Sequence, residues 1–90
     1  MIYGTGALVR SRAGHDKDRV FLIIGESSEY VTLVDGEIRT FRKPKCKLKK
    51  HVQIIHDKDE QQRKKQIEET GLTDEAVREL LQCYERKGQL

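Results

Sequence analysis

The fold of this chain is decided by one apolar run, Val20-Phe21-Leu22-Ile23-Ile24-Gly25. The run is rich in β-branched and bulky apolar side chains, which favours a strand. Because successive side chains of a strand point to opposite faces, an uninterrupted apolar run predicts a strand that is buried on both faces. We therefore predict that this strand lies at the centre of a small barrel.

Four shorter segments complete the predicted sheet. In chain order they cover residues 7–11, 30–34, 37–41 and 52–55. A polar loop over residues 12–19 precedes the apolar run, and its Gly14 is predicted to adopt a positive φ. Asp35-Gly36 predicts a two-residue type I′ hairpin turn between the second and third of these segments. Residues 1–56 are therefore predicted to form a five-stranded domain.

Residues 57–90 are predicted to form a helical C-terminal extension. Asp57 is predicted to cap the first helix, with Glu60 three residues later as in a capping box. This helix contains one large apolar residue, Ile67, so we predict that it is mostly solvated. Gly71 is predicted to end it.

A second helix is predicted to begin after Thr73, whose hydroxyl suits the N-cap position, and Leu72 can pack against Val77 across the helix start. The apolar side chains recur with helical spacing at Ala76, Val77, Leu80, Leu81 and Tyr84. Such a stripe packs on the barrel or binds a partner protein, and its spacing leaves both alternatives open. Cys83 on this helix is predicted to be buried or half-buried.

A basic segment, FRKPKCKLKKH at residues 41–51, contains six Lys and Arg and no acid. Lysines occupy every second position from Lys43 to Lys49, and the proline between them favours an extended chain. An extended chain would place these lysines on one side, with Cys46 and Leu48 on the other. The spacing between neighbouring lysines in this row would be close to the spacing between phosphates along one nucleic-acid strand. The alternative is a solvated edge strand that its lysines protect from aggregation.

Positive charge is concentrated in the first part of the chain. Residues 1–56 contain 11 Lys and Arg against 6 Asp and Glu, whereas residues 57–90 contain 7 against 9. Such clustering is typical of a surface that binds a polyanion. No stretch approaches the roughly 18 apolar residues of a membrane helix, and the N-terminus shows no signal peptide. The two cysteines indicate no disulfide framework, so a cytoplasmic location is expected.

The sequence contains no catalytic or metal-binding constellation. Its Ser and Thr residues lack a His and acid relay, and no paired carboxylates occupy an apolar setting. The set Cys46, His51, His56 and Cys83 lacks the spacing of a zinc site. We therefore expect no enzymatic activity, no metal and no other cofactor, and the oligomeric state stays open.

Several parts of the chain resemble a known family. The stretch at residues 6–24, which contains GALV, GHDKDR and VFLII, resembles the KOW motif of SH3-like barrels. The segments DGEIR at 35–39 and KPKCKLKKH at 43–51 look like the small bacterial KOW-domain RNA-binding proteins. Those proteins are similar to a group of archaeal and eukaryotic large-subunit ribosomal proteins, and LTDE at 72–75 also resembles the start of their C-terminal helix. Asp18 departs from the pattern, because many KOW motifs have a second glycine there.

The resemblance implies that the five predicted strands form an SH3-like barrel, which the two short helices predicted above follow, and it implies RNA binding through basic loops. The implied partners are ribosomal RNA or another structured RNA, and the ribosome. The implied contacts are Arg10, Arg12, His15, Lys17, Arg19, Arg42, Lys43, Lys45, Lys47, Lys49 and Lys50. Lys and Arg on exposed loops bind phosphates without much sequence discrimination, which agrees with such a partner.

Three alternatives remain open from the residues alone. The cations of the first loop can instead pair within the protein with Asp16 and Asp18. Tyr30 and Phe41 are predicted to be core residues, and stacking on bases is the alternative. The alternative function is a protein-interaction module that docks a translation or transcription factor through the barrel or the C-terminal helix.

Overall fold

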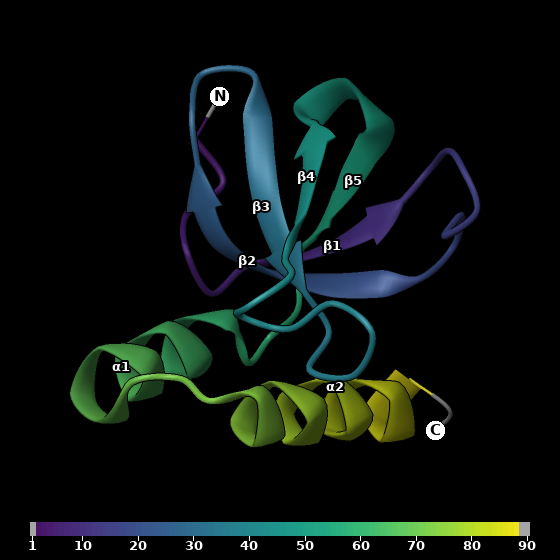
Figure 1. The fold of residues 1–90 in the computed structure, drawn as a ribbon. Coiled ribbons are helices and arrows are strands. Elements are labelled where there is room, and N and C mark those ends of the chain that lie inside the picture. The colour runs from purple at the N-terminus through teal and green to yellow at the C-terminus, as the bar shows by residue number, and fades with distance from the viewer. Residues whose placement is uncertain (1, 89–90) are drawn as a thin grey trace.

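A computed structural model describes residues 2–88 of the chain, in which five strands are followed by two helices (Figure 1). The strands are β1 (Leu8–Ser11), β2 (Val20–Glu26), β3 (Tyr30–Val34), β4 (Lys45–Leu48) and β5 (Val52–Ile55). A 3-10 turn, η1 (Lys49–His51), joins β4 to β5, and the helices are α1 (Glu60–Thr70) and α2 (Asp74–Gly88). Neither helix of this described part is long and apolar enough to cross a membrane.

The strands form one antiparallel sheet in the order β4-β3-β2-β1-β5. The strand β2 contains the apolar run and is central, as predicted, with β1 on one side and β3 on the other. The strand β4 pairs with β3 and β5 pairs with β1, so β4 and β5 are the two edges. The structure therefore confirms a mainly β domain with two C-terminal helices, and its five-stranded sheet is open.

Both faces of β2 are buried, which confirms the prediction drawn from its apolar run. On one face, Phe21 and Ile23 belong to a core cluster built within the sheet. On the other face, Leu22 belongs to a second cluster, to which α2 contributes Val77 and Leu81. This division follows from strand geometry, because alternate side chains of β2 point to opposite faces of the sheet.

The two helices lie together on one side of the sheet (Figure 1). The apolar stripe of α2 is used inside the protein, because Val77 and Leu81 are buried and Tyr84 packs beside them. Packing on the sheet, one of the two alternatives for this stripe, is therefore confirmed. Cys83 is exposed, so the prediction that it is buried or half-buried is wrong. Two residues beyond Leu81, it lies roughly 200° around the helix from the packed side.

The hairpin predicted at Asp35-Gly36 is wrong, and residues 37–41 form no strand. The buried Asp35 carboxylate accepts hydrogen bonds from the backbone N–H groups of Glu37 at 2.9 Å and Arg39 at 2.8 Å. These local bonds satisfy donors that a hairpin ladder would otherwise use. The partner of β3 is β4 instead, with Tyr30 opposite Leu48 in the register.

Tyr30 and Phe41 are exposed, so the prediction that they are core residues is wrong. The exposed fraction is 45% for Tyr30 and 38% for Phe41. Tyr30 alternates with the buried Val31 along β3 and therefore points away from the inner core. Phe41 lies in the loop before β4, where its backbone N–H donates to Asp74 Oδ1 at 3.0 Å.

The helix ends agree with the sequence in two places and differ in one. The Thr73 hydroxyl accepts a hydrogen bond from the Ala76 N–H at 3.1 Å, which confirms the predicted cap of α2. Gly71 ends α1 with a φ of 75°, as predicted. Asp57 does not cap α1, because the N-cap residue is Asp59 and the Asp57 carboxylate binds the Arg63 guanidinium instead.

Candidate nucleic-acid interface

Two residues of the first loop, residues 12–19, have a positive φ, the backbone conformation that favours glycine. Gly14 has a φ of 85°, as predicted, and Asp18 has a φ of 74°. Asp is one of the few non-glycine residues that tolerate this left-handed region. The Asp18 N–H donates to Ser11 O at 2.8 Å, and Arg10 Nη1 donates to Asp18 O at 3.0 Å. Asp18 therefore keeps the turn in a conformation typical of glycine and adds an exposed carboxylate.

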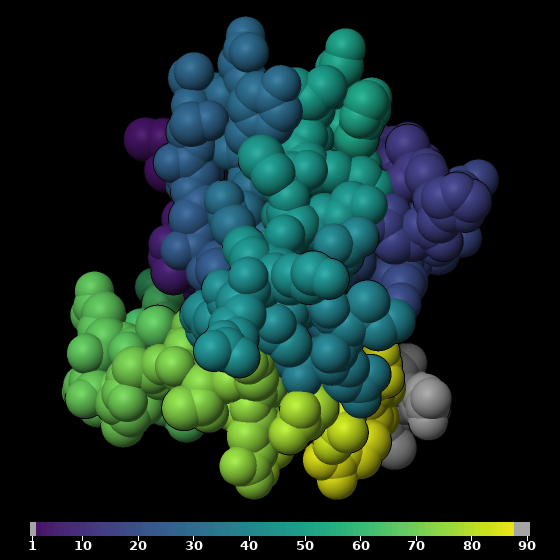
Figure 2. Space-filling view, viewed as in Figure 1, coloured from purple at the N-terminus to yellow at the C-terminus, as the bar shows by residue number. Residues whose placement is uncertain are grey.

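Asp16 ties this loop to the strand β4. Its Oδ1 lies 2.7 Å from Lys47 Nζ, and its Oδ2 lies 3.2 Å from Lys45 Nζ. The Ser11 hydroxyl also donates to Oδ1 at 3.0 Å. Burial alone would raise the pKa of Asp16, but the hydrogen bonds from Lys47, Lys45 and Ser11 outweigh it and hold the pKa far below its usual range. The first loop and the lysine segment, residues 41–51, are thus held side by side, as Figure 2 shows.

Three of the four lysines in the predicted row point towards the protein rather than into solvent. Lys45 and Lys47 share one side of β4, as the spacing predicted, but Lys47 is buried among Ser11 Oγ, the Ala13 carbonyl and Asp16. Lys49 belongs to η1 rather than to an extended strand. Its Nζ lies 2.9 Å from Glu26 Oε2 and 5.3 Å from the Tyr3 ring centroid.

The reason for this orientation is the position of the two acids. Asp16 and Glu26 lie far from the lysine segment in sequence but on the inner side of β4 and η1 in the fold. An ion pair that is largely shielded from water is stronger than an exposed one, provided that its remaining polar atoms are hydrogen-bonded. The side of β4 that carries Cys46 therefore faces outward, opposite to the expected orientation of the row.

The remaining basic side chains of the two segments are exposed. On these two segments, five exposed cations make no ion pair within residues 2–88, and we call them the outer cations: Arg12, Lys17, Arg42, Lys43 and Lys50. His15 is also exposed on the first loop. The sequence placed all six in the candidate site, and the structure brings the segments that carry them onto adjacent parts of the surface (Figure 2).

A small cavity of about 180 Å³ lies where the first loop meets the segment before β4. Basic residues from both segments line it, together with two acids: His15, Arg19, Arg39, Lys45, Asp16 and Asp35. Arg39 was missed from the sequence because it lay in a predicted strand rather than in a loop. A cation beside Asp35-Gly36 was the available signal, but only a loop conformation brings it to this cavity.

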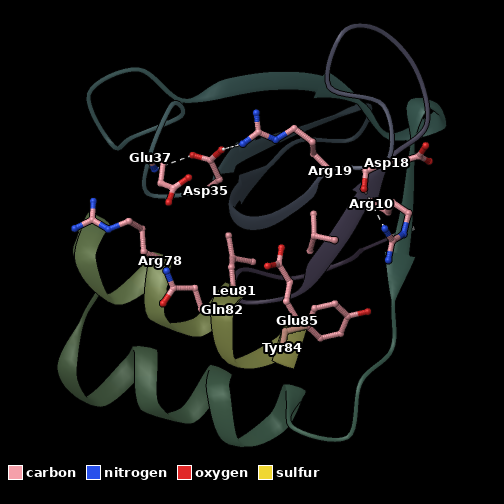
Figure 3. Close-up of a pocket in the computed structure, with 11 residues that line it drawn as sticks. Arg10, Asp18, Arg19, Asp35, Glu37, Arg78, Leu81, Gln82, Tyr84 and Glu85 are labelled. Atoms are coloured by element: carbon pink, nitrogen blue, oxygen red, sulfur yellow. Dashed lines mark hydrogen bonds and ion pairs between the residues drawn. The ribbon is translucent and has the colours of Figure 1, made fainter. Parts of the chain in front are cut away.

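Arg10 and Arg19 line a second depression, a groove of about 610 Å³ between the first loop and α2 (Figure 3). Arg19 Nη2 pairs with Asp35 Oδ2 at 3.2 Å across one wall. Tyr84 and Glu85 of α2 lie on the opposite wall (Figure 3). Arg19 therefore does pair within the protein, but its partner is Asp35 and not Asp16 or Asp18, the acids of the first loop.

Neither a comparison with models of known protein families nor a comparison with curated protein sequences finds a match for this chain. The described residues, 2–88, also contain no group of three or more His, Cys, Asp or Glu side chains placed to hold a metal ion. The candidate site is defined by exposed cations on two adjoining segments, and such a charge pattern favours anionic ligands.

Replacing Lys47 with methionine is expected to lower the free energy of unfolding by about 2 kcal/mol. The methionine keeps most of the apolar stem but removes three hydrogen bonds and leaves Asp16 with Lys45 as its remaining cation. Urea unfolding followed by circular dichroism measures the change. Lys50→Met is the matched control, because Lys50 is exposed and unpaired; its effect is expected to stay within about 0.5 kcal/mol. Equal effects of the two variants would contradict the structural role of Lys47.

Stability is expected to fall as the pH drops from about 5 towards 2. Burial alone would raise the pKa of Glu26, but Lys49 and the backbone N–H groups of Tyr3 and Gly4 outweigh it and lower the pKa to about 2. The pKa of Asp16 is depressed in the same direction. A carboxylate whose pKa is lower in the folded state stabilises that state above its unfolded-state pKa, near 4, and the stabilisation is lost as the pH falls.

Urea midpoints measured between pH 7 and pH 2 test this expectation. Glu26→Gln is expected to be less stable than the wild type at pH 7 and to lose less stability on acidification, because one of the titrating carboxylates is gone. A variant that loses as much stability as the wild type over this range would show that Glu26 is not one of the responsible groups.

Proposed function

We propose that this protein is a non-catalytic RNA-binding module that contacts the phosphate backbone of structured RNA, and that the RNA is ribosomal or translation-associated. The observation that carries the proposal is the junction at Asp16, which holds two basic segments side by side while their outer cations stay exposed. Exposed Lys and Arg on a rigid support bind phosphates and release counterions, which gives affinity with little sequence discrimination.

The proposal gives the eleven candidate residues different tasks. The outer cations and His15 make the contacts with RNA. Lys45, Lys47 and Lys49 set the shape of the surface, since their charges are already matched by Asp16 and Glu26. Arg10 and Arg19 form the wall between this surface and the groove beside α2.

We also propose that the domain is an SH3-like barrel of the KOW class. Lys47 on β4 hydrogen-bonds Ser11 at the end of β1, although these strands are three positions apart in the sheet. In a flat sheet three strand spacings would separate them by roughly 14 Å, so the sheet curls strongly. The two edge strands, β4 and β5, are also in contact at one end through the three-residue turn η1 that joins them. These contacts support the proposed class.

The alternative function, docking of a translation or transcription factor, has less support. The apolar stripe of α2 that suited a partner protein is occupied by the sheet. The groove beside α2 remains open, but charged side chains of both signs line most of it. Such a groove gives no large apolar surface for a protein partner, whereas the outer cations offer a polyanion an accessible surface.

A salt titration of a fluorescently labelled hairpin RNA tests the proposal. If the five outer cations each neutralise one phosphate, log K against log salt is expected to have a slope between about −3.5 and −4.5. A flat response would contradict phosphate binding. Fluorescence anisotropy between 50 and 300 mM KCl covers the useful range.

Two triple variants with the same change in net charge test whether RNA binds at the candidate site or elsewhere on the protein. Arg12→Gln, Lys17→Gln and Lys43→Gln together are expected to weaken RNA binding about 100-fold at 0.1 M salt. The control combines Lys58→Gln, Lys65→Gln and Arg86→Gln, three exposed cations of the helical part, and is expected to change affinity less than 5-fold. Equal losses would mean that only net charge matters, and would overturn the assigned surface.

A further inference from the structure

One side of the β3–β4 pair is exposed and is not used in the site described above. Along β3, Tyr30 and Thr32 point to the same face because they are two residues apart. Their partners across the ladder are Leu48 and Cys46, which share that face. Lys45 and Lys47, which pair with Asp16, point to the opposite face. The face that carries Tyr30 is therefore the outward side of β4, and we call it the outer β3–β4 face.

The helices leave this face uncovered. The same face of the sheet continues to Val34, Leu22 and Leu8, where α2 packs through its apolar stripe. Near β4 the helix does not cover this face: Tyr30 is 45% exposed and Cys46 is exposed. The Tyr30 ring, which shares this face with the smaller Thr32 and Cys46 side chains, is thus accessible to a flat ligand.

Positive charge borders the outer β3–β4 face at both ends. Arg42 and Lys43 follow the 38%-exposed Phe41, at the end where β4 begins. Lys50 lies in η1 at the other end, two residues beyond Leu48, the ladder partner of Tyr30. These three cations make no ion pair within residues 2–88. The combination of exposed rings with flanking cations complements a ligand with flat apolar faces and a phosphate chain.

We propose that the outer β3–β4 face binds unpaired nucleotides of RNA, with the Tyr30 ring stacked on a base and with Lys50 and Lys43 on the neighbouring phosphates. The proposal rests on the proposed RNA-binding function and deepens it, since it names the type of RNA segment that is recognised. Bases in a duplex are stacked on each other and do not offer a face to an aromatic side chain, whereas loops, bulges and ends do. Four residues of β4 extend over roughly 10 to 13 Å, which is enough for about two extended nucleotides.

The test compares two RNA probes and two variants at position 30. The probes are an unstructured eight-nucleotide RNA and a blunt twelve-base-pair RNA duplex. Tyr30→Leu is expected to weaken binding of the single strand about 10-fold and to change duplex binding less than 2-fold, whereas Tyr30→Phe keeps both affinities. The chain has no Trp, so quenching of tyrosine fluorescence by the single strand, reduced in Tyr30→Phe, reports stacking directly.

The possible results separate the two proposals. If Tyr30→Leu binds the single strand as tightly as the wild type, while Arg12→Gln, Lys17→Gln and Lys43→Gln together still weaken both probes, stacking is overturned and RNA binding stands. If the wild type binds neither probe in a salt-dependent way, both proposals fail. Tyr30→Thr, which keeps a residue that favours strands at this position, is a second variant with the same expected loss on the single strand alone, and keeps the test decisive should Tyr30→Leu fold poorly.

Discussion

Replacing Arg63 with alanine is expected to lower the free energy of unfolding by about 3 to 5 kcal/mol. Arg63 is 6% exposed, although α1 was predicted to be mostly solvated. Its Nε donates to the Gly6 carbonyl at 2.7 Å, and its two terminal nitrogens each lie 2.9 Å from an Asp57 oxygen. Hydrogen bonds from Arg63 hold the pKa of Asp57 below its usual range. The truncation leaves Asp57 largely shielded from water without its cation and leaves the Gly6 carbonyl without its donor.

Chemical unfolding monitored by circular dichroism measures this loss. Arg63→Lys is expected to be intermediate, because it keeps the charge but cannot form the two-pronged contact or reach Gly6 at the same time. Lys65→Ala is the matched control on the same helix, since Lys65 is exposed and unpaired within residues 2–88, and its effect is expected to remain within about 0.5 kcal/mol. A loss below 1 kcal/mol for Arg63→Ala would mean that α1 does not depend on this anchor.

Replacing Gly36 with alanine is expected to lower the free energy of unfolding by about 3 kcal/mol. Gly36 has a φ of 81°, which costs a residue with a side chain about 1 kcal/mol. An added Cβ would also collide with the backbone oxygen of Asp74 and would lie 2.7 Å from Arg78 Cγ. Because these atoms belong to the first turns of α2, the helix must move, and its packing on the sheet is disturbed at a cost of about 1 to 3 kcal/mol.

Gly71→Ala provides the control for this prediction. Gly71 has a similar φ of 75°, but an added Cβ would meet no atom within 4 Å. This variant therefore has the backbone strain without the collision, and we expect a loss of about 1 kcal/mol. The difference between the two variants in a urea titration measures the contact between Gly36 and α2. If both variants lose the same stability, that contact contributes nothing.

These contacts make the helical part a structural support of the candidate site. Arg78 Nη1 donates to the Gly36 carbonyl at 2.8 Å, so α2 holds the loop that carries Arg39, Arg42 and Lys43. The other end of that loop is held by Lys45 and Asp16. A loop fixed at both ends would lose little conformational freedom on binding the proposed RNA, which would favour affinity. Variants that release α2 are therefore expected to weaken the proposed RNA binding and also to lower the stability of the fold.

Much of the secondary structure could be predicted because its causes are local. Side-chain alternation and β-branching within a few residues account for β2 and for the strands at 30–34 and 52–55. The end of α1 at Gly71 follows from the positive φ that this position requires. The Thr73 cap is equally local, since its hydroxyl bonds an N–H three residues away. The basic character of the two candidate segments was also evident from composition.

The tertiary structure alone decided which side of each segment faces solvent. Lys47 turns inward because Asp16 lies 31 residues away in sequence but beside it in space, and Arg63 is buried because the Gly6 carbonyl, 57 residues away, lies next to it. Long-range contacts also decide the conformation at Asp35-Gly36, which forms a loop packed against α2 rather than a hairpin turn. Alternation along a strand separates two sets of side chains, but only long-range partners determine which set is buried, because burial of a charge requires an opposite charge at that place.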